Sequence, residues 1–181
     1  MNDEEDFYLL GFALYGVQAF EFGLYGIASH CSHLPDAQSE RRFRDLDPEK
    51  FLRGDISDLK ATLGQIVRVF GDSFLIGCDE LDAFIGKRND IAHNIWRFTN
   101  TSLHPSPIAD IKQYLKDFIA ESKYWRTIIR GLTAAMRVAA AEAEGRSDEL
   151  SLSDEDKRCM DAFYEHAARC KTNGQPDADA V

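Results

Sequence analysis

Apolar residues recur along most of the chain at the three- and four-residue spacing of amphipathic helices, and no stretch shows the strict alternation of a strand. We therefore predict an all-α protein, a bundle of four to five helices. The expected helices cover about residues 4–30, 55–70, 79–98 and 106–144, with a short fifth helix from 153 onward.

Three of these helices have recognisable start signals. Asp55 can cap the second helix, and Ser106 followed by Pro107 supplies a cap and a first-turn residue for the fourth. Ser153, with an acid three positions later, resembles a capping box. By contrast, residues 31–54 hold two prolines, one glycine and mixed charges, which predicts an irregular connection.

The length of 181 residues fits one domain with a sizeable core. We expect a helical bundle over residues 1–145 and a short accessory helix over residues 146–171. Residues 172–181 are acidic and polar, which predicts a disordered tail.

The first helix is apolar enough to raise the question of a membrane span. Gln18 and Glu21 interrupt its apolar run, and a charge near the centre of a span costs about 3 kcal/mol. We therefore expect a helix buried in the protein and no membrane partner. Its glycines favour close approach by another helix, either within the bundle or across a dimer interface. These glycines are Gly11, Gly16, Gly23 and Gly26.

The four cysteines show no CxxC pairing, and no secretory leader precedes them, so reduced thiols in the cytoplasm are expected. The run His30-Cys31-Ser32-His33 contains three potential zinc ligands, but the other cysteines lack matching spacing. The sequence thus predicts no metal site and no cofactor.

The net charge of −10 argues at first against a nucleic-acid partner. The charge is unevenly distributed, however. Between Gly86 and Arg137, nine Lys or Arg residues and four acids give +5, so the rest of the chain carries −15. The protein has one basic region.

A basic residue recurs at every seventh position of the fourth expected helix, which places these side chains along one stripe. The stripe is either a solvated helix face or a surface that follows an RNA backbone. Including its neighbours, the candidate RNA-binding residues are Lys87, Arg97, Lys112, Lys116, Lys123, Arg130 and Arg137.

The basic region includes the run Arg88-Asn89-Asp90-Ile91-Ala92-His93. Arginine can bind a phosphate through a two-pronged fork, and histidine can transfer protons near neutral pH. In a straight α-helix, however, Arg88 and His93 would point about 140° apart. Either Arg88 pairs with an acid on another helix and His93 is an ordinary surface residue, or two copies of the chain bring these residues together at a dimer interface.

The motif Arg88-Asn89-x-x-x-His93 is similar to the R-x4-H signature of the HEPN (higher eukaryotes and prokaryotes nucleotide-binding) domains, in which a polar residue is favoured after the arginine. The resemblance covers roughly residues 4–144. It implies an all-α bundle of four or five helices, with the motif at the end of a helix before a loop and another long helix.

The resemblance also implies a homodimeric, metal-independent endoribonuclease of toxin–antitoxin or antiviral defence systems. His93 would exchange a proton with the ribose 2′-hydroxyl or the leaving oxygen, Arg88 would stabilise the charge on the phosphorane, and Asn89 would orient the imidazole or the phosphate. The product would carry a 2′,3′-cyclic phosphate. The expected partners are RNA, a second copy of the chain, and an antitoxin or regulatory protein.

Two observations leave alternatives open. In one toxin branch the antitoxin modifies a tyrosine two positions after the histidine, where this chain has Ile95. Many HEPN-like proteins also use the fold for binding only. The alternative function is therefore a non-catalytic interaction module or a ligand-binding bundle.

Overall fold

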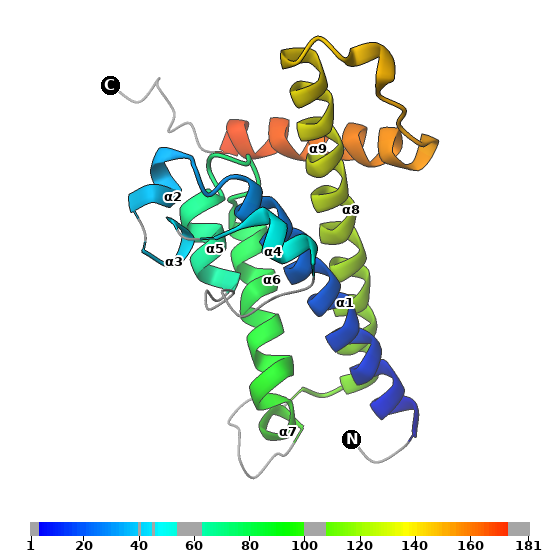
Figure 1. The fold of residues 1–181 in the computed structure, drawn as a ribbon. Helices are drawn as coiled ribbons and strands as arrows, with labels where there is room; N and C mark the ends of the chain where they lie inside the picture. The colour runs from blue at the N-terminus through cyan, green and yellow to red at the C-terminus, as the bar shows by residue number, and fades with distance from the viewer. Residues whose placement is uncertain (1–3, 40, 45, 54–62, 100–107, 174–181) are drawn as a thin grey trace, which may run out of the picture. The chain divides into compact units, whose positions relative to one another are not determined.

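The structure is a computed structural model that describes residues 4–39, 41–44, 46–53, 63–99 and 108–173. These residues are largely helical and contain no strand, which confirms the all-α prediction (Figure 1). They form more helices than the four to five expected. In chain order the elements are α1 (Glu4–His30), α2 (Pro35–Ser39), α3 (Arg41–Arg44), α4 (Pro48–Leu52), α5 (Leu63–Phe70), α6 (Asp79–Asn89), the π-helical η1 (Asp90–Asn94), α7 (Ile95–Phe98), α8 (Ile111–Ala143), the 3-10 turn η2 (Ser147–Glu149) and α9 (Asp154–Asn173).

The prediction of an irregular connection over residues 31–54 is wrong, because α2, α3 and α4 lie there. Two of these short helices begin at a proline, whose fixed φ suits the first turn of a helix. At α4 the side chain of Asp47 accepts a hydrogen bond of 2.8 Å from the backbone N–H of Glu49. The prolines therefore start helices here instead of interrupting them.

The sequence also predicts three helix caps and a disordered C-terminal tail. The caps at Asp55 and at Ser106–Pro107 lie outside the described residues. So does the predicted tail from residue 174 onward, whereas residues 172 and 173 belong to α9. The capping box is present, since Ser153 Oγ donates to Asp156 Oδ2 at 2.7 Å and accepts from the Asp156 backbone N–H at 3.1 Å.

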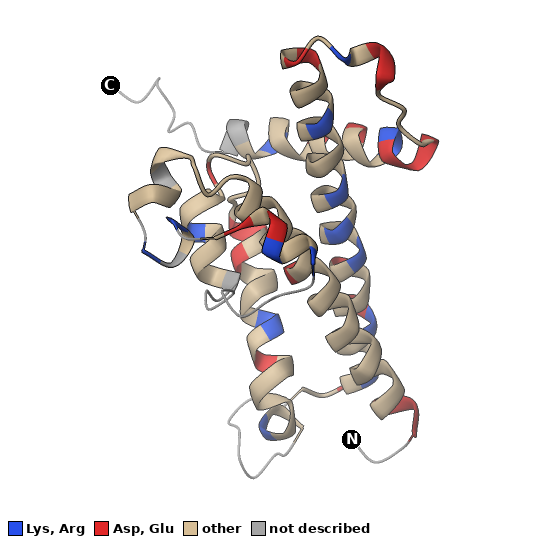
Figure 2. Ribbon diagram, in the orientation of Figure 1, with Lys and Arg blue, Asp and Glu red and all other residues tan. Residues whose placement is uncertain are grey.

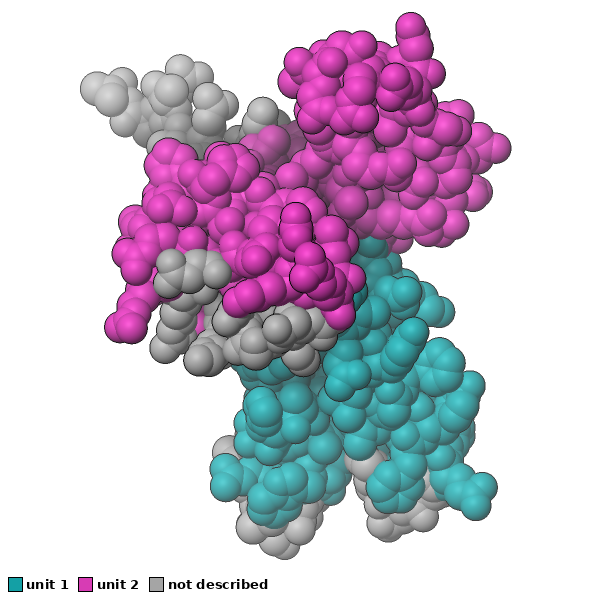
Figure 3. Space-filling model, in the orientation of Figure 1, with its two compact units in different colours: residues 1–22, 79–126 teal, residues 23–78, 127–181 magenta. Residues whose placement is uncertain are grey.

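The chain divides into two compact units, each built from segments distant in sequence (Figure 3). Unit 1 comprises residues 1–22 and 79–126, and unit 2 comprises residues 23–78 and 127–181. Unit 2 includes part of the segment expected to form one bundle as well as the expected accessory helix. The boundary at residue 145 stays a prediction.

The core of unit 1 is an aromatic cluster contributed by α1, α6 and α8. Phe84 stacks on Phe118 at a centroid distance of 5.1 Å and meets Phe20 edge to face at 5.4 Å. Trp125 completes the cluster, at 6.2 Å from Phe84 and 6.4 Å from Phe20. All four side chains are buried. Such pairs contribute about 0.5–1.5 kcal/mol each beyond their buried area, so this cluster fixes the three helices that surround the motif.

In unit 2, α3, α5 and the turn after α5 pack through Phe43, Phe70 and Phe74, with centroid separations of 5.1–5.3 Å. The crossing of α8 and α9 depends on Gly131, where a Cβ would overlap the backbone carbonyl of Cys159. A glycine is therefore required at this crossing.

Three of the four α1 glycines are explained by close approach inside the chain. A Cβ at Gly16 would lie 2.5 Å from Ser122 Oγ, one at Gly23 would lie 2.8 Å from Ile129 Cγ2, and one at Gly26 would lie 3.0 Å from Phe51 Cε1. Gly11 is different, because a Cβ there would meet no described atom within 4 Å.

Gly11 lies among large exposed side chains on α1. Among the described helices, α1 has the length and the apolar composition needed to cross a membrane. Only 28% of its most apolar 18-residue window is buried within the chain. The helix leaves several large aromatic side chains exposed to solvent. The exposed α1 aromatics are Phe7, Tyr8, Phe12, Tyr15 and Phe22.

Candidate functional site

The predicted motif lies where an α-helix changes to a π-helix. Arg88 and Asn89 end α6, and His93 lies in the π-helical segment η1. A π-turn holds more residues than an α-turn, because its backbone hydrogen bonds join residues five apart. The directions of Arg88 and His93 therefore differ by less than the roughly 140° expected for an α-helix. Short π-segments inside helices are frequent at functional sites.

The Arg88 guanidinium is directed toward α1 within unit 1. Its Nη2 lies 2.6 Å from Glu21 Oε1, and its Nη1 donates a hydrogen bond of 3.0 Å to Asn89 Oδ1. The two charged side chains are only 23% and 17% exposed. The Arg88 Nε has no acceptor among the described residues, and Glu21 Oε1 is close to Nη2 without hydrogen-bond alignment. A cation on an apolar helix face has thus found the partner that burial requires.

The other motif residues face solvent. Asn89 and His93 are exposed, while Ile91 between them is buried. One turn beyond, Trp96 is 56% exposed, and the Arg97 guanidinium carbon lies 5.4 Å from the centre of its ring. An exposed imidazole, an amide, an indole and a cation therefore share a short stretch of one helix. This set can contact a phosphate, exchange a proton and stack on a base.

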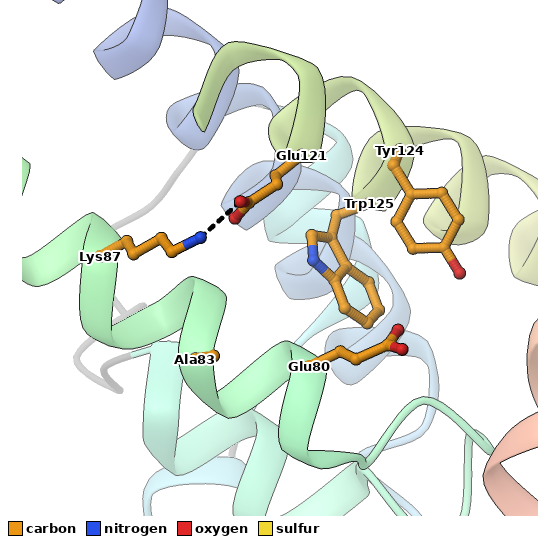
Figure 4. Close-up of a pocket in the computed structure, with 6 residues that line it drawn as sticks. All are labelled: Glu80, Ala83, Lys87, Glu121, Tyr124 and Trp125. Carbon is orange, nitrogen blue, oxygen red and sulfur yellow. Dashed lines mark hydrogen bonds and ion pairs between the residues drawn. The ribbon is translucent and has the colours of Figure 1, made fainter. Parts of the chain in front are cut away.

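Lys87 is directed toward α8, where it forms an ion pair with Glu121 (Figure 4). The pair lies at a hollow of about 290 Å³. The hollow is lined by Glu80, Ala83, Lys87, Glu121, Tyr124 and Trp125. Because the one lysine in this lining is already paired, the hollow offers little net positive charge to an anionic ligand.

Tyr114 of α8 lies near the carboxylates of Asp90 and Glu121. Burial raises the pKa of its phenol above the ordinary value of 10.0, and the negative charges of Asp90 and Glu121 raise it further. The phenol therefore stays protonated well above neutral pH and remains a hydrogen-bond donor near η1.

The predicted basic stripe is present on α8, but acids neutralise part of it (Figure 2). In unit 1, Lys112 Nζ lies 2.7 Å and Lys116 Nζ 3.7 Å from Glu5 carboxylate oxygens. In unit 2, Arg130 pairs with Glu155 at 2.5 Å and with Asp156 at 2.8 Å.

The remaining predicted basic residues, Lys123 and Arg137, are exposed on α8, as Arg97 is on α7. The positive charge available to a polyanion is therefore smaller than the sequence count of +5 suggests.

The potential zinc ligands of the run His30-Cys31-Ser32-His33 do not converge into one of the candidate metal-binding groups among the described residues. Cys31 is buried, and burial raises the pKa of its thiol above the ordinary 9.0. His30 is exposed, with its Nδ1 2.8 Å from the Gly26 carbonyl oxygen.

Sequence reasoning missed two residues of the motif's surroundings. In the sequence Glu21 interrupts an apolar run, and nothing near it in the sequence connects it to Arg88. Trp96 has a local signal in the sequence, since it follows His93 by three positions.

Comparison of the chain with protein-family models, curated proteins and solved structures finds no match.

Proposed function

We propose that the chain is a metal-independent endoribonuclease of the HEPN type, active as a homodimer in toxin–antitoxin or antiviral defence. The observation that carries this proposal is the arrangement at the α6–η1 junction. It combines an exposed His93 on a π-helical turn with an exposed Asn89 at the end of α6 and an arginine held beside that asparagine.

His93 is the proton-transfer group. It accepts the proton of a ribose 2′-hydroxyl, whose oxygen then attacks the adjacent phosphorus. The bond from phosphorus to the 5′-oxygen breaks, and that oxygen takes up a proton. The products carry a 2′,3′-cyclic phosphate and a 5′-hydroxyl. DNA lacks the attacking hydroxyl and is not cut by this route.

Arg88 and Asn89 bind the phosphate. The Glu21 carboxylate fixes Arg88 Nη2, and Arg88 Nη1 lies 3.0 Å from the exposed Asn89 amide. A phosphate oxygen that replaces the amide oxygen on Nη1 would lie beside Asn89 and on the side of the helix that carries His93. Glu21 is then a positioning residue, which keeps the guanidinium from rotating at the cost of part of its positive field.

Trp96 and Arg97 extend the site along α7. Base stacking on an exposed aromatic contributes about 1–3 kcal/mol per base without strict sequence preference. The Trp96→Ala variant should therefore raise KM more than it lowers kcat, whereas loss of His93 should act on kcat. Steady-state cleavage of a fluorogenic RNA separates the two.

The exposed face of α1 supports a second copy of the chain as partner. Tyr8, Tyr15 and Phe22 recur every seven residues, which is the spacing of a helix–helix seam. Gly11 lies between the first two of them, with open space where a Cβ would stand, so a facing helix can approach closely.

The Tyr15→Arg variant tests this interface. Tyr15 is 65% exposed, so the substitution leaves the core intact, yet it places a charge in the proposed seam. Sedimentation velocity should show a dimer for wild type and at least a tenfold weaker one for Tyr15→Arg. Tyr164→Arg is the matched control, because Tyr164 is 52% exposed on α9. A monomeric wild type, or wild type that pellets with lipid vesicles in place of dimerising, contradicts the proposal.

A second candidate function is a non-catalytic interaction module. It is favoured by the ion pairs Arg88–Glu21 and Lys87–Glu121, since the cation of the motif and the cation before it are already neutralised by acids of the same unit. In that case Arg88 is structural, and His93 has no reaction partner.

Cleavage by purified variants distinguishes the two functions. Wild type, His93→Ala and Arg88→Ala are incubated with RNA, and His33→Ala serves as control because His33 is an exposed histidine outside the motif. We expect wild type and His33→Ala to cut RNA and the two motif variants to lose at least about 100-fold in rate. No cleavage by the wild type would support the interaction module, and equal cleavage by all four proteins would contradict the roles given to His93 and Arg88.

A further inference from the structure

Three potential metal ligands converge in unit 2, whereas the motif belongs to unit 1. Cys78 is the residue before α6 begins, while His166 and Cys170 are four apart on α9 and therefore share one face of that helix. The ligand atoms of all three lie within 4.8 Å of one another. Cys170 Sγ lies 3.3 Å from His166 Nε2.

We propose that Cys78, His166 and Cys170 bind a zinc ion. Two thiolates and one imidazole form a ligand set that selects Zn²⁺ over Mg²⁺ or Ca²⁺, which prefer oxygen. Tetrahedral coordination, with Zn–S of about 2.3 Å and Zn–N of about 2.0–2.1 Å, sets ligand atoms about 3.5–3.8 Å apart. The 3.3 Å contact is already near this value, and the 4.8 Å limit requires side-chain shifts of only about 1 Å.

Burial and access both suit a bound ion. His166 is only 1% exposed, so its imidazole is fixed in a site shielded from water. Cys78 and Cys170 are partly exposed, which leaves a route for the metal and for the thiol protons that binding releases. With three protein ligands, the fourth position is available to water.

The other two cysteines do not share these properties. Cys31 and Cys159 are buried, and burial raises the pKa of both thiols, which opposes the thiolate form that binds metal. Cys159 is also on α9, so it supplies a matched control on the same helix.

The bound ion would connect the residue that leads into α6 to the C-terminal half of α9, two segments far apart in sequence but within one unit. It takes no part in the proposed RNA cleavage, and the inference does not depend on that function.

The test is a Zn²⁺ titration of the full-length chain in competition with a chromophoric chelator, in the presence of a non-thiol reductant. Wild type should bind one equivalent. Cys78→Ala and Cys170→Ala should bind at least about 100-fold more weakly, because loss of a direct ligand exceeds the 10–100-fold cost of losing an outer-shell partner. Cys159→Ala should stay within threefold of wild type.

A Cys78→His variant keeps the test decisive if an alanine variant fails to fold. It retains a zinc ligand at this position, so binding should survive within about tenfold. With Co²⁺ as probe, wild type should show the intense visible bands of tetrahedral coordination and a thiolate charge-transfer band, and Cys78→His about half of that charge transfer. Absence of stoichiometric zinc binding by wild type, equal affinity in all variants, or a cobalt spectrum without thiolate charge transfer overturns the site.

Discussion

The ion pair between Arg88 and Glu21 links the stability of unit 1 to the candidate site. The pair joins α6 to α1, with Nη2 2.6 Å from Oε1 and with about four-fifths of each side chain withdrawn from solvent. Because the Arg88 Nε lacks an acceptor among the described residues, a guanidinium deprived of Glu21 retains only its bond to Asn89.

The expected cost follows from burial. Removing one partner of a fully buried pair costs about 3–5 kcal/mol, whereas exposed pairs contribute about 0–1 kcal/mol. With exposures of 17% and 23%, Glu21→Gln should lower the free energy of unfolding by about 2–3 kcal/mol. Arg88→Met should cost a similar amount, because it leaves the carboxylate unpaired. The double variant should lose about 1–2 kcal/mol less free energy of unfolding than the two single variants lose together.

Urea unfolding followed by tryptophan fluorescence measures this cycle. Both tryptophans of the chain, Trp96 and Trp125, belong to unit 1, so the signal reports the unit that contains the pair. The control cycle uses Arg53 and Glu49 of unit 2, an ion pair of 2.9 Å whose side chains are 77% and 76% exposed. Because both tryptophans report unit 1, this control is followed by far-UV circular dichroism. Its coupling should stay near 0.3–0.5 kcal/mol, roughly the value for exposed helix pairs. Equal coupling in the two cycles would refute the assignment of Glu21 as the anchor of Arg88.

Further predictions concern a helix crossing and a helix cap of unit 2, with a control in unit 1. Gly131→Ala should destabilise the chain by about 1–3 kcal/mol, because its Cβ meets the Cys159 carbonyl, whereas Gly86→Ala, which enters open space on a helix, should stabilise it by up to about 1 kcal/mol. Thermal unfolding monitored by circular dichroism compares them, and the same sign for both would contradict the packing described. Ser153→Ala should remove a helix cap worth about 1 kcal/mol near neutral pH. The Ser153 hydroxyl, and after it Arg130, lowers the pKa of Asp156 below its ordinary 3.8. The stabilisation from the Ser153 hydroxyl on the Asp156 carboxylate is present above about pH 4 and is lost as the pH falls through the lowered pKa. The stability difference between wild type and Ser153→Ala should therefore narrow in acid, and a difference that widens there would refute this role of Ser153.

The sequence predicted α1 and the helical stretch over residues 79–98 because long apolar periodicity and helix-forming residues agree there. It missed α2 and α4 although both carry a local signal, a proline in the first turn, and Asp47 before Pro48 is a standard cap. A proline thus predicts an irregular segment only when it does not lie in the first turn of a helix.

Other features had no local signal at all. An α-turn and a π-turn at Asp90–Asn94 differ by one hydrogen-bond register, which no local sequence pattern distinguishes. Glu21 and Cys78 reach their partners only after distant segments pack together, so neither could be assigned from spacing. The predicted Arg88, by contrast, was informative because a cation on an apolar helix face demands a partner.

The chemistry of the cut ends tests the central claim most directly. A pool of mixed-sequence RNA oligonucleotides is incubated with the wild-type chain without added divalent metal, and the products are identified by mass spectrometry. The proposed mechanism predicts 2′,3′-cyclic phosphate and 5′-hydroxyl ends, which should be absent with His93→Ala and with 2′-deoxy versions of the cleaved oligonucleotides. An uncut pool, ends with 3′-hydroxyl and 5′-phosphate, or undiminished cleavage by His93→Ala would contradict it.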